Sequence, residues 1–370
     1  MGKNGVLIFS GYNNRAVITF CRFSVQKKIP FYIVSKGEED LIYKSDYVKN
    51  IVYKRKKTDL SIEDVLFCSN LIRNKKDLDK IVILPSTEYL NRLLLENYIL
   101  LLENNIEFGL HKRDVYELLS NKHSFGELCR VNSINIPSQI LKDDATNFPL
   151  VVKPKTYFNK QNEVFAPEVV HNKEELDSYF KNKNEENFYL QEYIKGRSIY
   201  FLYYIFPNGS YSVYSQENYM QQFNGGSMII AKSSECHSNK IAAEFADIFV
   251  NVGYKGLIMV EVKVFNEKFY MIEANPRLWG PSQLILDAQM DLFDCFAYDN
   301  GLITELTNQK YLPDTWYYWS GGLTENLNNE LPVTFYNFDE DNLEINRNEI
   351  EQNEVYNRKD TVSIYKFENK

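Results

Sequence analysis

Three polar side chains recur at every second residue near the end of one extended segment: Glu273, Asn275 and Arg277. A strand places alternate side chains on one face, so these three are expected to share a face. Glu261 lies on the preceding extended segment, and a turn at Asn266–Glu267 joins the two in a hairpin. Pairing of the strands can bring Glu261 to the same face. Two carboxylates and an amide oxygen form the hard-oxygen site that suits Mg²⁺.

The residues around these acids favour a metal site over a solvated charged face. Most of the intervening side chains are apolar, and they include Val260, Val262, Val264, Tyr270 and Ile272. Magnesium in such sites keeps substrate phosphates among its ligands, and Mn²⁺ is the alternative ion. Lys263 shares the face of Glu261. Arg277 and Lys263 are therefore the candidate catalytic residues, because each can stabilise charge on a transferred phosphoryl group.

The elements that precede this hairpin begin with strand–helix alternation. Expected strands are Val6–Ser10, Phe31–Val34, Asn50–Tyr53, Ile81–Leu84 and Phe108–Leu110, and expected helices are Arg15–Lys27, Ser61–Ile72 and Tyr89–Asn104. This order predicts an α/β domain with a doubly wound parallel sheet. Ligands of such sheets bind beyond the carboxyl ends of the strands. The loops Ser10–Arg15 and Pro85–Glu88 lie at those ends; Ser10–Arg15 lacks the three glycines of a dinucleotide fingerprint.

The C-terminal half has the pattern of an α+β unit with antiparallel sheet. Expected strands are Leu150–Pro154, Phe188–Ile194, the aromatic segment Ser198–Val213 with its turn at Pro207–Gly209, and the hairpin Leu257–Val264 with Lys268–Glu273. Expected helices include Arg113–Leu119, Lys122–Cys129, Ile241–Val252, Ser282–Met290 and Leu292–Tyr298. The polar tail carries strand-like patches at Val333–Phe338 and Val362–Phe367. We expect it to cover the preceding domain.

Composition excludes several classes of protein. A chain of 370 residues is long enough for two or three domains of roughly 150 residues each. The formal net charge of −8 argues against a free-standing duplex nucleic-acid binder. The five cysteines show no C-x-x-C spacing and are expected to be reduced thiols of a cytoplasmic protein. No stretch approaches the ~18 apolar residues of a membrane helix, so no membrane partner is expected.

The hairpin and its continuation resemble a known family. Glu261…Glu273-x-Asn275-Pro-Arg277 looks like the metal-binding end of the ATP-grasp superfamily, and Asn275-Pro-Arg-Leu-Trp-Gly280 is similar to its carboxylate–amine ligase branch. The resemblance spans roughly residues 1–300 and implies a two-lobed ATP-grasp module after the N-terminal domain. It implies the division 1–111 (Rossmann-like), 112–192 (small lobe with linker helices), 193–330 (large lobe with the metal site) and 331–370 (covering segment).

The same resemblance implies a set of ATP-binding residues. Lys122 and Lys153 match the two lysines that bind nucleotide phosphates. Gln191-Glu-Tyr-Ile194 looks like the hinge strand, where Gln191 would meet the adenine amino group. The backbone of Glu192 and of Ile194 would complete adenine recognition, and Ser198 stands where an acid often holds the ribose. Taken singly, each of these side chains could instead be an ordinary polar residue on the protein surface or on a strand, without a role in ATP binding.

The predicted cleft lacks one glycine-containing loop of the family and has another. No glycine occurs between Gly126 and Gly196, so the glycine-rich loop that usually covers the phosphates is missing, and Lys155 or Lys160 would have to compensate by charge. A later loop does contain glycines. Gly225, Gly226, Ser227 and the following Lys232 are the candidate substrate-binding residues, with a plain hairpin turn as the alternative.

The resemblance implies an ATP-dependent carboxylate–amine ligase that forms an amide or peptide bond through an acyl phosphate and releases ADP and phosphate. Its partners would be ATP, Mg²⁺, a small carboxylate and a small amine, and the family offers a homodimer as one assembly. Three alternatives stay open. They are a kinase, a carboxylase that uses bicarbonate, and a nucleotide-binding regulator without turnover, which the missing glycine loop would favour.

Overall fold

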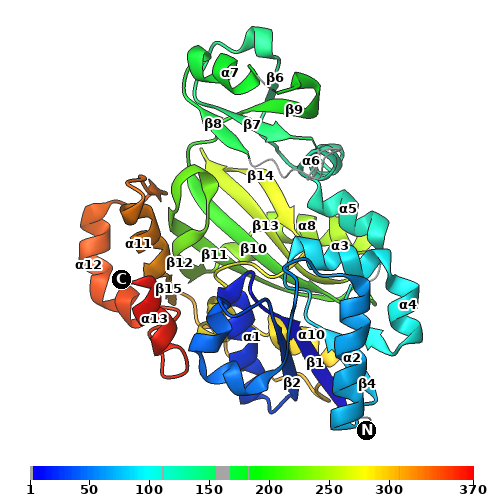
Figure 1. Ribbon diagram of the computed structural model, residues 1–370. Helices are drawn as coiled ribbons and strands as arrows, with labels where there is room; N and C mark the ends of the chain where they lie inside the picture. Colours follow the sequence, from blue (N-terminus) through cyan, green and yellow to red (C-terminus); the bar gives the residue numbers. More distant parts are fainter. Residues whose placement is uncertain (1–2, 111, 156–166, 182, 308) are drawn as a thin grey trace.

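The computed structural model describes residues 3–110, 112–155, 167–181, 183–307 and 309–370. Three sheets organise the chain, and Figure 1 shows them stacked from the N-terminal domain at the bottom to a small lobe at the top. In the described part of the chain, no helix is both long enough and apolar enough to cross a membrane. All five cysteines are free thiols.

The N-terminal sheet is parallel and has the strand order β3-β2-β1-β4-β5. Its strands are β1 (Asn4–Phe9), β2 (Phe31–Ser35), β3 (Ile51–Lys54), β4 (Lys80–Ile83) and β5 (Ile106–Glu107). Helix α1 (Asn14–Gln26) packs on one face with Val6 and Ile8. Helices α2 (Ile62–Lys76), α3 (Glu88–Glu96) and α4 (Tyr98–Glu103) pack on the other with Leu7 and Phe9. The predicted doubly wound sheet is confirmed.

Two local predictions in this domain were wrong. The expected helix Tyr89–Asn104 is two helices, because Asn97 leaves the helical conformation (φ −113°) and its side chain donates to Leu93 O. Asparagine competes with the helix for backbone hydrogen bonds in this way. The last strand is Ile106–Glu107 and not Phe108–Leu110; Gly109 has a positive φ, which ends the extended backbone.

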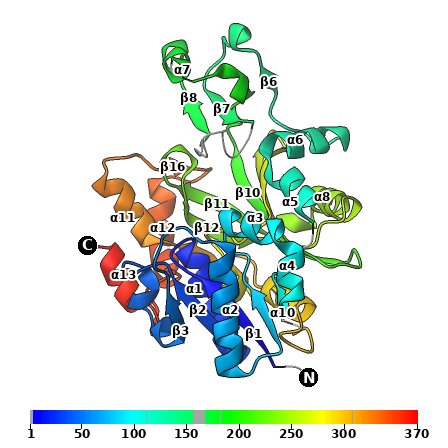
Figure 2. The ribbon, with the colours of Figure 1, turned by 45° about the vertical axis from the view of Figure 1, so that its right-hand side comes forward.

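The small lobe is a four-stranded antiparallel sheet with the order β6-β9-β7-β8. Its strands are β6 (Gln139–Ile140), β7 (Leu150–Pro154), β8 (Glu168–Val170) and β9 (Phe188–Glu192), covered by α7 (Lys173–Phe180). It has its own apolar core, which includes Leu150, Leu176 and Phe188. Helices α5 (Arg113–Ser120) and α6 (Lys122–Val131) lead into it from the N-terminal domain, and Figures 1 and 2 both show it standing apart above the rest.

The large sheet is antiparallel with the order β14-β13-β10-β11-β12-β15, and β16 pairs with β11. The strands are β10 (Arg197–Ile205), β11 (Tyr211–Gln221), β12 (Met228–Ser234), β13 (Gly256–Phe265), β14 (Lys268–Asn275), β15 (Trp316–Tyr318) and β16 (Thr334–Phe335). Helix α8 (Lys240–Asn251) packs against Phe201 and Tyr203 of β10. Helices α9 (Gln283–Asp287) and α10 (Leu292–Asp299) lie on the side of Tyr200 and Tyr204. Aromatic side chains thus fill both faces of this sheet.

The C-terminal tail packs beside the large sheet as helices more than strands. Its helices are α11 (Ser320–Asn328), α12 (Glu340–Gln352) and α13 (Val362–Glu368). The predicted strand at Val362–Phe367 was therefore wrong, and the patch at Val333–Phe338 contains only the two residues of β16. Thr361 and Ile364 are buried while Lys366 is exposed. That spacing follows a helix and not the alternation of a strand.

Candidate functional site

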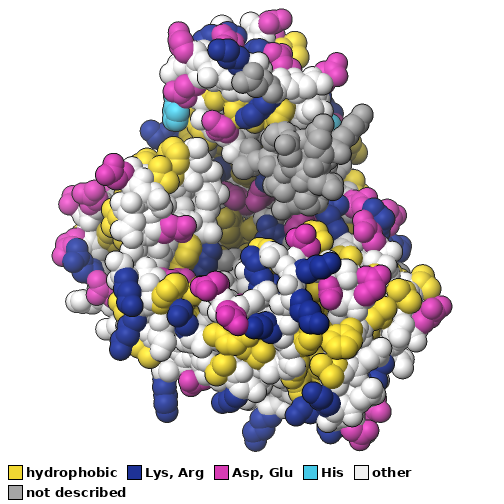
Figure 3. Space-filling model, viewed as in Figure 1, with side chains coloured by type: hydrophobic (Ala, Val, Ile, Leu, Met, Phe, Trp, Pro, Cys, Tyr) yellow, Lys and Arg dark blue, Asp and Glu magenta, His cyan; other side chains and the backbone are white. Residues whose placement is uncertain are grey.

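A cavity of about 1330 Å³ lies between the small lobe, the large sheet and the N-terminal domain. Figure 3 shows the hollow below the small lobe on the front face. Most of the predicted site residues line it: Lys122, Lys153, Gln191, Glu192, Ile194, Gly225, Gly226, Ser227, Glu261, Lys263, Glu273, Asn275 and Arg277. Residues that are separated by more than 100 positions in the sequence therefore line the same cavity. The predicted lysine Lys160 lies outside the described residues.

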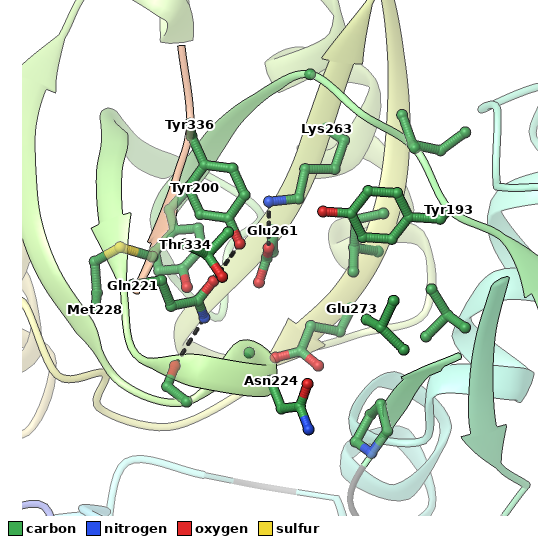
Figure 4. A pocket seen from close by; sticks show the side chains of 18 of the residues that line it. Tyr193, Tyr200, Gln221, Asn224, Met228, Glu261, Lys263, Glu273, Thr334 and Tyr336 are labelled. Carbon is green, nitrogen blue, oxygen red and sulfur yellow. Dashed lines mark hydrogen bonds and ion pairs between the residues drawn. The ribbon is translucent and has the colours of Figure 1, made fainter. Parts of the chain in front are cut away.

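The acidic centre of the cavity comes from the hairpin of β13 and β14. Glu261 lies directly opposite Glu273, and Met259 lies opposite Asn275, so the predicted shared face is confirmed. Asn275 Nδ2 donates to Glu273 Oε1 over 2.7 Å, and Arg277 Nη2 donates to Asn275 Oδ1 over 3.0 Å. Figure 4 shows Glu261 and Glu273 directed into the pocket beside Lys263.

Each of the two acids is paired with a lysine. Lys122, the first residue of α6, makes an ion pair with Glu273, and Lys263 Nζ lies 3.4 Å from Glu261 Oε1. The geometry of the second pair is not that of a hydrogen bond, and Lys263 Nζ is buried without a hydrogen-bond acceptor among the described residues. Burial lowers the pKa values of Lys122 and Lys263, and Glu261 opposes both shifts.

A third lysine reaches the site from the small lobe. The register between β13 and β14 shifts after Glu261, which leaves Ile272 as an extra residue. Such a bulge takes one residue out of the regular strand pairing. Lys153 Nζ of β7 donates to Ile272 O over 3.2 Å. Lys153 is only 5% exposed, and burial together with the charge of Lys122 lowers its pKa to about 7. Lys153 is thus available to an anionic ligand, in surroundings that disfavour its charge.

The charge of the lining opposes the charge of the chain. Among the described lining residues, seven are Lys or Arg and three are Glu, while the whole chain carries −8. A cavity with surplus cations attracts anionic ligands. Burial of cations without full compensation costs stability, and this makes the cavity a candidate functional site.

The strand β9 contributes an unpartnered acceptor. Gln191 is 5% exposed; its Nε2 donates to Pro137 O over 3.3 Å, whereas its Oε1 is buried and has no donor among the described residues. The Glu192 N–H already donates to Ser138 O over 2.9 Å. Tyr193 and Ile194 follow and line the same part of the cavity. A ligand with an N–H group directed at Gln191 would satisfy that oxygen.

Comparison with known proteins rests on the fold, since no family model and no curated protein matches the sequence. The structure resembles a Campylobacter jejuni biotin carboxylase–β,γ-ATP complex (TM-score 0.62, 16% identity, 85% of this chain and 74% of that one). It also resembles the biotin carboxylase domain dimer of Hydrogenobacter thermophilus 2-oxoglutarate carboxylase with MgADP, ADP and bicarbonate (0.61, 15%, 85% and 73%). A third match is N5-carboxyaminoimidazole ribonucleotide synthetase from Thermus thermophilus (0.58, 14%, 84% and 81%).

These neighbours are ATP-grasp proteins. The chain has the ATP-grasp fold. It spans only 29% of the length of a further match, Rhizobium etli pyruvate carboxylase (TM-score 0.61, 16% identity, 84% of this chain). The fold thus agrees with the resemblance to the ATP-grasp superfamily that the hairpin motif indicated.

Two residues of the predicted ATP-grasp site do not line the cavity. Ser198 is fully buried and accepts a hydrogen bond from Asn218 Nδ2 over 3.1 Å. Lys232 lies farther along β12, where its Nζ is 3.1 Å from Asp314 Oδ1 and over the ring of Trp316. Strand β11 supplies the partner of Ser198, and the turn before β15 supplies Asp314 for Lys232, which the sequence order alone could not show.

Sequence reasoning also missed residues of this ATP-grasp cavity. Tyr336 comes from the tail, hydrogen-bonds Gln221, and lies with its ring 3.5 Å from Lys263 Nζ (Figure 4). Nothing in the polar tail marked this tyrosine. Arg15 and Trp279 line the cavity too. Arg15 belongs to the strand-end loop Ser10–Arg15, and Trp279 belongs to the motif that ends at Gly280. These two segments were the sequence signals that could have identified them as cavity residues.

Proposed function

We propose that this chain is an ATP-dependent carboxylate–amine ligase. The observation that carries the proposal is the cluster of Lys122 and the buried Lys153 and Lys263 around Glu261 and Glu273, inside a cavity of the ATP-grasp fold. Three lysines face two carboxylates in this cluster, and anionic phosphates would supply the further negative charge. The cavity of about 1330 Å³ leaves room for a nucleotide and a small acid together.

The nucleotide would lie between the small lobe and the large sheet. Gln191 Oε1 is the unpartnered acceptor for the adenine amino group, and the Ile194 N–H has no hydrogen bond to a described residue. Lys153 and Lys122 would bind phosphate oxygens, since Lys153 reaches Ile272 O beside the acidic centre and Lys122 pairs with Glu273. Ser198 is not part of this proposal, because it is covered.

Glu261, Glu273 and Asn275 would hold Mg²⁺, or Mn²⁺. The donor set fits a hard cation, with two carboxylates and an amide oxygen on one face. Within the described ranges no cluster of three or more His, Cys, Asp or Glu side chains could hold a metal; the substrate phosphates would therefore complete the set. When bound, the ion would neutralise phosphate charge.

The reaction would proceed in two steps. A carboxylate oxygen of the substrate attacks the γ-phosphorus of ATP, the bond to the bridging oxygen breaks, and ADP leaves with its electron pair. The amine then attacks the acyl phosphate carbon, phosphate leaves, and the amine gives up a proton. Arg277 and Lys263 would stabilise charge on the transferred group and Lys122 charge on the phosphates. Gly225, Gly226 and Ser227 would border the substrate.

A screen of ADP release tests this proposal. Carboxylates are combined with amines in the presence of Mg²⁺, with omission of each component. A ligase needs both an acid and an amine. A kinase needs no amine and leaves a stable phosphorylated product. The carboxylase alternative, which the biotin carboxylase neighbours favour, needs bicarbonate. ATP binding without ADP release in any combination would contradict the ligase and indicate a regulator.

Gln191 offers a test of the adenine position. Gln191→Leu removes the proposed acceptor, so we expect the Kd for ATP to rise about 10-fold and the preference for ATP over GTP to shrink. Isothermal titration calorimetry with both nucleotides measures this. Gln139→Leu, an exposed change on the neighbouring strand β6, is the control. An unchanged ATP/GTP ratio in Gln191→Leu would place adenine elsewhere.

A further inference from the structure

The end of the cavity away from the small lobe is built around an arginine. Arg15 is the second residue of α1, and Figures 1 and 2 place α1 below the large sheet, on the side opposite the small lobe. Arg15 lines the cavity with Ser227, Met228, Trp279 and Gly280. These residues come from the N-terminal domain, from β12 and its loop, and from the turn after β14.

The guanidinium of Arg15 is held in place without an ion pair. One nitrogen, Nη1, donates to Met228 O over 2.9 Å and to the Tyr317 hydroxyl over 3.1 Å, and the group stacks 3.8 Å over the ring of Trp319. No described carboxylate lies within ion-pair distance of it. Burial raises the pKa of Glu368 and the charge of Arg15 opposes this rise, but Glu368 accepts instead from Trp319 Nε1 over 2.8 Å. Nη2 has no acceptor among the described residues, so this cation keeps donors for a ligand.

The surroundings of Arg15 are rich in donors. A Cβ on Gly280 would lie 2.8 Å from Arg15 Nη2, so the glycine lets the guanidinium approach the turn. Trp279 is 2% exposed, and its Nε1 is buried without an acceptor among the described residues. An unpaired buried N–H is unfavourable, and an acceptor on a ligand would relieve it. The first N–H groups of α1 face no helical acceptor either.

From these contacts we propose that Arg15, with Trp279 and the start of α1, binds a carboxylate of a substrate that is not the carboxylate being activated. This inference rests on the proposed function and specifies its substrates. One of the two co-substrates then carries a spare carboxylate: the acid is a dicarboxylate, or the amine is an amino acid. Arginine suits this role because its planar fork matches a carboxylate in two hydrogen bonds.

The test compares carboxylates with their amides in two arms. The acid arm uses succinate and glutarate against succinamate and glutaramate, and the amine arm uses free amino acids against amino acid amides, each with MgATP. We expect ADP release by the wild type to favour the spare carboxylate in one arm by about 10- to 100-fold, and Arg15→Met to abolish that preference. The arm that responds identifies the substrate. Arg15→Lys should restore the preference in part.

Two further measurements on the wild type and the Arg15 variants separate binding of the spare carboxylate from a structural role of Arg15. Calorimetry measures the binding of MgATP, and the melting temperature measures the stability of the fold. Arg347→Met, on exposed α12, is the matched control. A purely structural Arg15 would lower stability and leave the ratio of carboxylate to amide unchanged, which would overturn the inference. So would equal rates of ADP release with acids and amides in the wild type. A wild type that binds MgATP but releases no ADP with any compound, or one that does not bind MgATP, would contradict the proposed function itself.

Discussion

Glu273→Ala is expected to reduce ADP release by about 100-fold or more. Glu273 faces Glu261 across the hairpin, accepts from Asn275 Nδ2, and pairs with Lys122. Its loss removes one of the two carboxylates proposed for Mg²⁺ and leaves Lys122 without its nearest acid. Initial rates of ADP release at saturating substrates measure the effect, and the Mg²⁺ concentration for half-maximal rate should rise.

The control for this change is Glu244→Ala on α8, which removes a carboxylate paired with Lys240 on the protein surface. Both variants should melt close to the wild type, since neither removes core packing. An unaffected rate in Glu273→Ala would refute the assignment of the metal to the β13–β14 hairpin. Normal activity with a lowered melting temperature would assign Glu273 to structure alone.

Lys153→Met is expected to weaken ATP binding and stabilise the fold at the same time. The lysine is 5% exposed and hydrogen-bonds only Ile272 O among the described residues, so its charge is poorly solvated. Without it, the Kd for ATP should rise about 10- to 100-fold, because a charge-assisted bond to a phosphate is lost. The free energy of unfolding should rise by about 1–3 kcal/mol near pH 7, because methionine fills the space without a charge.

The pH dependence of this stability change has a definite sign. The folded pKa of Lys153 is about 7, below its ordinary value of 10.5, so the unfolded chain binds more protons between these values. The contribution of Lys153 to the free energy of unfolding therefore rises with pH from about 7 to 10.5. The advantage of Lys153→Met should be greatest below pH 7 and shrink toward pH 10.

Urea titrations from pH 6 to about pH 9.5 measure this advantage, with Lys173→Met on exposed α7 as the control. Tighter ATP binding in Lys153→Met would exclude a phosphate role for this lysine. A stability gain that grows with pH would show that the charge of Lys153 is compensated in the folded chain.

The local patterns of the sequence carried much of this structure. Period-two spacing predicted the shared face of Glu261, Glu273 and Asn275, and the register confirms it, because cross-strand pairing in a tight hairpin follows from neighbouring residues. Strand–helix alternation predicted the N-terminal parallel sheet, because parallel strands are joined by crossover helices. The motif around Asn275–Gly280 indicated the ATP-grasp superfamily, and the fold agrees.

Other features depended on contacts between distant segments. The place of Tyr336 beside Lys263 follows from β16 pairing with β11. The helix at Val362–Glu368 follows from the burial of Ile364 and from packing against α11 and the segment Leu41–Lys44. Ser198 and Lys232 have side chains of the right chemistry, but adjacent segments supply Asn218 and Asp314 as partners. The burial of Ser198 and the pairing of Lys232 therefore depend on residues that are distant in the sequence.

The sequence by itself determined the acidic hairpin, the candidate lysines and the alternation that builds a parallel sheet, since each depends on short-range spacing. Only the tertiary structure decided which lysines and arginines line the cavity and which of them are paired with a carboxylate. It also decided that Arg15 lies in the cavity with Trp279 and hydrogen-bonds Met228 O. Burial and charge compensation are properties of three-dimensional neighbours. They change the pKa of Lys153 and leave the guanidinium of Arg15 open to a substrate, and no periodicity along the chain reports them.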